Sequence, residues 1–176
     1  ATCAAAPEFA KAGLAQVAPT ATDSSLTPGA AFASKPRRQY PTFFRVCPPD
    51  DDYAPALADF LAGKKVRSVA AVDDGSDYGK RFNAAFAATF SKLGGSVVEA
   101  GAVDPETGEN AAAVAKVKAA RPQAVVFGGI DADGAPLSQA LKPAGVIVPL
   151  TGGDWLYTPH YHTNTGIQSA RDHSIH

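Results

Sequence analysis

Short apolar runs alternate with longer amphipathic stretches along most of this chain. The short runs predict β-strands, whereas the stretches between them carry apolar residues three and four positions apart and predict helices. After residue 40 we expect strands at residues 42–47, 66–72, 96–103, 124–127 and 146–150, and helices at residues 50–63, 78–93, 110–120 and 133–144.

The helix expected at residues 78–93 has the most regular pattern. Tyr78, Phe82, Phe86 and Phe90 fall four positions apart, and a Gly-Gly pair follows the last apolar residue. An aromatic stripe of this kind is typical of a helix that faces a core. The strand expected before it, at residues 66–72, is almost continuously apolar, as strands covered on both faces of a parallel sheet are.

Repeated strand and helix units of this length predict right-handed β-α-β crossovers. The expected fold class is therefore α/β, with parallel sheets flanked by helices. The first forty residues repeat the pattern on a smaller scale, with a helix at 4–12, a strand at 14–18 and a long polar connection at 19–38.

The end of the chain lacks this pattern. All four histidines lie from His160 onward, and the apolar periodicity stops at Pro159. His160 and His162 would share one face of a strand and could bind a metal. Because no cysteine or fixed carboxylate lies nearby in the sequence, we expect no metal site there. Residues 159–176 instead suggest a loosely ordered or foreign segment.

Charge and length exclude several classes of protein. The chain has 176 residues, with 16 basic and 17 acidic side chains and a net charge of −1. This balance gives no electrostatic reason to expect a nucleic-acid partner. No apolar run is long enough to cross a bilayer, so we expect no membrane insertion of this chain. The absence of methionine suggests that residue 1 is not a translation start.

The two cysteines fit neither a redox motif nor a zinc spacing. Cys3 and Cys47 could form a disulfide, but two small buried thiols are the simpler interpretation. The redox compartment stays open on this observation.

Candidate chemistry gathers where the predicted strands end, the edge at which open parallel sheets bind ligands. Two kinds of site are possible there. In the first, a carboxylate such as Asp154 meets an ammonium group and aromatic rings form the wall. In the second, Asp73, Asp74 and Asp131 bind Mg²⁺ as in a receiver domain, although the lysine of such a domain is missing. Helix N-caps are an alternative explanation for Asp73, Asp74 and Asp133.

Motifs for catalysis are absent from the sequence. It contains no GxGxxG, GxxxxGK[ST] or GxSxG, and no histidine falls within the folded pattern to act as a base. We therefore expect neither an enzyme nor a cofactor.

Five segments resemble, in the same order, the type I periplasmic solute-binding proteins, and most closely their leucine/isoleucine/valine-binding branch. The likeness extends from residue 1 to about residue 158. The segments are GLAQVAPTATDSSLT, YPTFFRVCPPDDDYAPALADFL, VRSVAAVDDGSDYGKRF, AVVFGGIDADGAPLSQALKPAG and VPLTGGDWLY.

The resemblance implies two α/β lobes that close about a hinge over a ligand in the cleft between them. Members of the family are about twice as long as this chain. Residues 1–45 would then be the remnant of an incomplete N-terminal lobe, residues 46–158 the main lobe, and residues 159–176 an atypical tail.

The resemblance also implies which residues bind the ligand. Thr20 would offer its main-chain carbonyl to the ligand ammonium, and Thr22 would bind the carboxylate through its hydroxyl and N–H. Tyr78 would line the wall opposite these two threonines, and Asp154 would be the acidic partner of the ammonium. Two further wall positions, often aromatic in the family, are Ile130 and Asp131.

The implied function is the substrate-binding component of an ABC transporter, periplasmic or extracellular through secretion or a lipid anchor. Its ligand would be a branched-chain or similar amino acid and its partner a permease. One alternative is a ligand-sensing receptor or regulator domain with the same fold. Another is a metal-dependent α/β enzyme or receiver-like domain that uses Asp73, Asp74 and Asp131.

Overall fold

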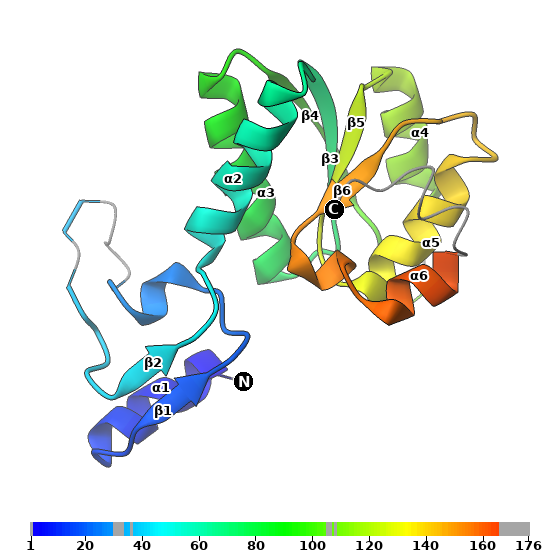
Figure 1. The fold of residues 1–176 in the computed structure, drawn as a ribbon. Helices are drawn as coiled ribbons and strands as arrows, with labels where there is room; N and C mark the ends of the chain where they lie inside the picture. Colours follow the sequence, from blue (N-terminus) through cyan, green and yellow to red (C-terminus); the bar gives the residue numbers. More distant parts are fainter. Residues whose placement is uncertain (1, 30–33, 36, 105–106, 108, 166–176) are drawn as a thin grey trace. The chain divides into compact units, whose positions relative to one another are not determined.

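The computed structural model describes residues 1–176 apart from 1, 30–33, 36, 105–106, 108 and 166–176. The chain divides into two units, Ala1–Tyr53 and Ala54–His176. Figure 1 shows the elements of each.

The first unit pairs two short parallel strands. It contains α1 (Thr2–Lys11), β1 (Gln16–Ala18), the 3₁₀ helix η1 (Ser24–Leu26) and β2 (Phe43–Arg45). Gln16 is opposite Phe43 in the register. A small core of Ala6, Ala18, Leu26 and Phe43 joins the helix to the strands. The helix and both strands expected in residues 1–47 are therefore confirmed.

The second unit is built on a four-stranded parallel sheet in the order β4-β3-β5-β6. The helices α2 and α3 lie on one face of this sheet, and α4 and α5 cover the other face (Figure 1). The α2 helix begins in the first unit. The strands are β3 (Ser68–Asp73), β4 (Ser96–Ala102), β5 (Ala124–Gly128) and β6 (Leu150–Gly152). The helices are α2 (Asp50–Gly63), α3 (Asp77–Lys92), α4 (Ala111–Ala120) and α5 (Asp131–Leu141). The predicted α/β class is confirmed.

The central strands are buried on both faces, as their continuous apolar sequences indicate. Val72 and Phe127 contribute to a core shared with Val117 of α4 and Leu137 of α5. The aromatic stripe of α3 packs as predicted: its three phenylalanines are all buried, and the rings of the last two stack with centroids 5.2 Å apart.

The last strand differs from the prediction. The apolar run suggested residues 146–150, but β6 covers Leu150–Gly152, because Pro149 has no N–H to donate to a ladder and the strand begins only after it. Val146 still packs into the core, whereas Ile147 is largely exposed. Val146 and Val148 therefore belong to a loop that packs on the edge of the core. The α5 helix also starts two residues before the predicted position.

The expectation of loose order after residue 158 is wrong for residues 159–165. After the 3₁₀ helix η2 (Asp154–Leu156), Pro159–Thr165 form a further helix, α6, that packs against α5. Tyr161 of α6 is completely buried in the core of the second unit. The polar residues around Tyr161 conceal this buried ring from a periodicity search. Residues 166–176 lie outside the described part, and the predicted domain limits at 45 and 158 stay predictions.

Two further expectations bear on the chain as a whole. In the described residues, none of the helices is both long and apolar enough to cross a membrane. Cys47 is half-buried and forms no disulfide with a described residue. The side chain of Cys3 lies outside the described part, so the proposed pairing stays untested.

Candidate functional site

The sheet of the second unit has a switch point between β3 and β5. The chain leaves β3 to form β4 on one side and returns to form β5 on the other, so the crossovers run in opposite directions. Loops that follow the carboxyl ends of such strands diverge and leave a crevice for ligands. The residues after β3, β5 and β6 are therefore the ones to consider.

The two aspartates at the end of β3 build the turn into α3. The Asp73 carboxylate accepts a hydrogen bond from the Gly75 N–H at 2.8 Å. Asp74 is buried, and its carboxylate accepts from the N–H and the hydroxyl of Ser76 at 3.0 and 2.5 Å. The true N-cap is Ser76, whose Oγ accepts from the Gly79 N–H. Asp73 and Asp74 thus shape the loop, and the prediction that one of them caps α3 directly is wrong.

Two glycines let α3 approach the sheet closely. A methyl group on Gly79 would overlap the carbonyl oxygen of Gly128, and a methyl group on Gly128 would overlap that of Gly79. The first turn of α3 therefore rests directly on the end of β5. This packing fixes the place of Tyr78, the residue before Gly79, at the same edge of the sheet.

Tyr78 lies beside the loop that follows β6. A methyl group on Gly153 would come 2.6 Å from the Tyr78 hydroxyl oxygen and 3.3 Å from the ring of Phe82. Gly153 directly precedes Asp154, the first residue of η2. The structure thus brings Tyr78 and the Asp154 loop together, in agreement with their expected places at one edge.

The Asp154 carboxylate is only partly solvated although the residue as a whole is exposed. Partial desolvation raises the pKa of Asp154 above its ordinary value, and the N–H groups of Asp154 and Trp155 oppose this rise. A partly desolvated carboxylate gains more from a bound cation than a fully hydrated one does.

Asp131 serves mainly to hold α6. Its carboxylate accepts hydrogen bonds from the Ala132 N–H at 2.9 Å and the Thr158 hydroxyl at 2.5 Å, and His160 Nδ1 lies 3.3 Å away. The sequence pattern singled out His160 only as a possible metal ligand together with His162, and Thr158 belonged to no motif, so no pattern linked either residue to Asp131. Ile130, next to it, is 39% exposed in an extended conformation.

Asp133 lies within the first turn of α5 and is not its N-cap, so that prediction is wrong. Burial, followed by the negative charges of Asp74 and Asp131, raises the pKa of the Asp133 carboxyl. Despite these neighbouring carboxylates, the described residues contain no group of three or more His, Cys, Asp or Glu placed to hold a metal ion. The metal-dependent alternative thus finds no assembled site in this part of the chain.

Thr20 and Thr22 belong to the first unit. Thr20 is exposed in the loop after β1, and Thr22 is buried. The Thr22 carbonyl accepts from the Asp50 N–H at 2.9 Å. The same loop is held by the Arg45 guanidinium, which sequence reasoning missed; the signal was a single charge within the apolar run TFFRVC.

Comparison with known proteins supplies the family. A family model described as "Periplasmic binding protein" matches residues 2–173. The chain belongs to this family. The match extends well into residues 159–176, so the expected departure of that segment from the family is wrong.

Curated relatives of the periplasmic binding protein family cover most of the chain. It is 35% identical over 150 residues to "Leu/Ile/Val-binding protein homolog 3" of Brucella melitensis and 31% identical over 149 residues to a Leu/Ile/Val-binding protein of Rhizobium johnstonii. The alignments cover 85% and 84% of this chain, but 38% of each relative. The chain therefore spans well under half the length of these relatives.

Solved structures of the family show the same fold. A type 1 periplasmic binding protein from Bordetella pertussis matches with a TM-score of 0.81 at 25% identity, over 94% of this chain and 44% of that one. A branched-chain amino acid transporter substrate-binding protein from Streptococcus pneumoniae, in complex with isoleucine, also gives a TM-score of 0.81, at 20% identity over 96% and 45%. The predicted type I periplasmic-binding-protein fold is confirmed.

Proposed function

We propose that this chain is part of the substrate-binding component of an ABC transporter that takes up a branched-chain or similar amino acid. The observation that carries the proposal is the match of a periplasmic binding protein model to residues 2–173, together with relatives described as Leu/Ile/Val-binding. A periplasmic or extracellular location and a permease partner follow from the same proposal. The protein binds its ligand and catalyses no reaction.

The edge of the second unit supports an amino-acid ligand. Asp154 offers a partly desolvated carboxylate for the ammonium group, and Tyr78 offers an aromatic wall beside it. An ammonium bound to a carboxylate by charge-assisted hydrogen bonds has a defined direction as well as a favourable energy. Ile130 adds exposed apolar surface after β5. Asp131 contributes less directly, because its oxygens already bind groups of α5 and α6.

The loop of the first unit supports recognition of the carboxylate end. Among the described residues, none accepts from the Thr22 N–H or bonds to its hydroxyl, whereas its carbonyl is bound to Asp50. The two donors of Thr22 are therefore the groups left for a ligand carboxylate, and the Thr20 carbonyl is the acceptor for an ammonium. These contacts hold the α-amino and α-carboxyl groups that all amino acids share. Selection among amino acids would come from the residues that surround the ligand side chain.

Isothermal titration calorimetry of the natural protein that carries this sequence tests the proposal. The ligands are leucine, isoleucine, valine and, for contrast, glutamate and lysine. Replacing Asp154 by asparagine removes a charged partner and is expected to weaken binding about 10- to 100-fold. Asp59→Asn, at an exposed position of α2, is the matched control and should leave the affinity unchanged.

Two results would refute the proposal. One is the absence of binding for every amino acid of the panel. The other is an Asp154→Asn variant that binds as tightly as the Asp59→Asn control, since the carboxylate would then not contact the ammonium.

A further inference from the structure

Arg45, the last residue of β2, gathers the loop between β1 and η1. Its guanidinium donates to the carbonyl oxygens of Ala21 at 3.1 Å, Asp23 at 3.0 Å and Ser24 at 3.4 Å. It also donates to the Thr27 hydroxyl at 2.6 Å. The planar guanidinium thus binds three carbonyl oxygens within four residues of sequence. A flexible lysine ammonium would not hold these three oxygens in one geometry.

The hold on Ala21 sets the direction of the next amide. The described residues contain no cis peptide bond, and in a trans peptide the carbonyl of one residue and the N–H of the following residue point in opposite directions. Because the Ala21 carbonyl points to the guanidinium, the Thr22 N–H points away from it. The charge of Arg45 also polarises this peptide, which makes the N–H a stronger donor.

The groups that follow in the loop are fixed as well. The Thr22 carbonyl accepts from the Asp50 N–H at 2.9 Å, and the Asp23 carboxylate accepts from the Ser25 N–H at 2.9 Å and the Ser25 hydroxyl at 2.8 Å. Every carbonyl from Ala21 to Ser24 is therefore engaged within the first unit. What the loop leaves to a ligand is the Thr22 N–H and hydroxyl.

We propose that Arg45 is a positioning residue for ligand binding, which orients the Thr22 N–H toward the ligand carboxylate before the ligand arrives. The inference deepens the proposed function and rests on it. Preorganised donors strengthen binding because no ordering of the loop has to accompany it. Arg45 itself does not contact the ligand.

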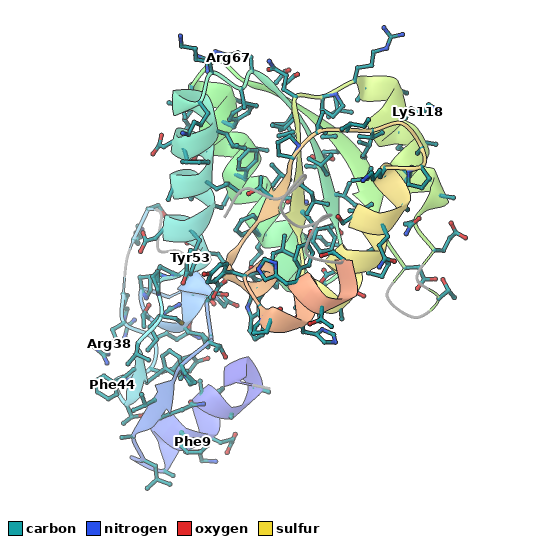
Figure 2. The ribbon with its side chains drawn as sticks, turned by 45° about the vertical axis from the view of Figure 1, so that its right-hand side comes forward. Phe9, Arg38, Phe44, Tyr53, Arg67 and Lys118 are labelled. Carbon is teal, nitrogen blue, oxygen red and sulfur yellow. The ribbon has the colours of Figure 1, made fainter. Side chains whose placement is uncertain are left out.

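Three variants separate this role from general stability. Arg45→Met keeps the length of the side chain and removes the guanidinium, whereas Arg45→Lys keeps the charge. Arg38→Met is the matched control: Arg38 lies in the same unit, donates to the Phe43 carbonyl at 2.9 Å and stacks 5.0 Å from the Phe44 ring centroid (Figure 2). Among the bonds that Arg38 makes to described residues, none reaches the loop of residues 21–27.

Calorimetry with leucine, isoleucine and valine is done below the unfolding temperature of every variant, so that all of the protein is folded. Arg45→Met is expected to weaken binding about tenfold or more, Arg45→Lys less, and Arg38→Met not at all. Unchanged affinity in Arg45→Met, with the unsubstituted protein binding normally, overturns the inference.

Hydrogen exchange distinguishes failure of this inference from failure of the proposed function. If the natural protein binds none of the amino acids, the proposed function fails. The exchange rates of the Ser25 and Leu26 backbone amides then show whether Arg45 orders the loop. Faster exchange of these amides in Arg45→Met and Arg45→Lys, but not in Arg38→Met, supports the ordering of the loop by Arg45, on which the positioning role depends. Equal protection in all three variants overturns it.

Discussion

Replacing Tyr161 by phenylalanine should stabilise the second unit. The side chain is completely buried under α6, and its hydroxyl has no hydrogen-bond partner among the described residues. Burial raises the pKa of the Tyr161 phenol, and the adjacent Ser138 hydroxyl opposes this rise without reaching hydrogen-bond geometry. The Ser138 hydroxyl is likewise buried and without a partner.

The expected size of the effect follows from these contacts. A buried polar group without a partner costs about 1–3 kcal/mol, and Tyr161→Phe removes one while keeping the ring in the core. A gain of about 1 kcal/mol would raise the melting temperature by about 2–4 °C in a chain of this size. Tyr161→Ala removes the ring as well and should lose about 3–5 kcal/mol of stability.

Urea unfolding followed by tryptophan fluorescence is a suitable assay. The sequence contains one tryptophan, Trp155, which lies in η2 beside α6, so its emission reports on the second unit. The expected result is a higher urea midpoint with an unchanged slope for Tyr161→Phe. A lower midpoint would refute the reasoning, because it would mean that the hydroxyl has a partner in solution. Combining the change with Ser138→Ala shows whether that partner is Ser138.

Three further predictions concern the edge of the sheet. Asp133→Asn should stabilise the protein at pH 7, because burial and nearby carboxylates raise the pKa of Asp133 in the folded state and its ionised form therefore disfavours folding. The difference in stability between the variant and the unsubstituted protein should vanish below about pH 4. Denaturant titrations at several pH values can check this. Gly79→Ala should cost about 1–3 kcal/mol in thermal unfolding, since β5 blocks the added methyl group, whereas Gly63→Ala, with open space around it, should not. The affinity for an amino acid should fall when the pH is lowered through the raised pKa of Asp154, because the carboxylate then loses its charge. Calorimetry at several pH values tests this. The prediction is contradicted if Asp154→Asn binds more weakly but shows the same pH dependence.

Elements with a regular apolar spacing could be predicted from the sequence. The α3 helix is set by four aromatic positions and a capping serine, all of them local, and its predicted limits differ from the observed ones by a single residue at each end. The β6 strand could not be placed in this way, because Val146 and Val148 are apolar for a different reason: they pack on the edge of a core without joining a ladder.

The candidate site shows the same division. The position of Asp154 and Tyr78 at one edge follows from the parallel sheet, which fixes where strand ends meet. The use of Asp131 to anchor α6 depends on Thr158 and His160, a contact between distant segments that no local pattern encodes. The role of Arg45 likewise rests on carbonyl oxygens, which every residue carries and which therefore leave no mark in a sequence.

The strand order β4-β3-β5-β6 has a consequence for how the chain is made. During synthesis β3 emerges first, β4 then pairs with one side of it, β5 with the other, and β6 with the outer side of β5. Each new strand meets a free edge, and none has to insert between two strands that are already joined. The nascent chain can therefore pair these four strands by addition alone, without breaking a strand pair that it has already formed.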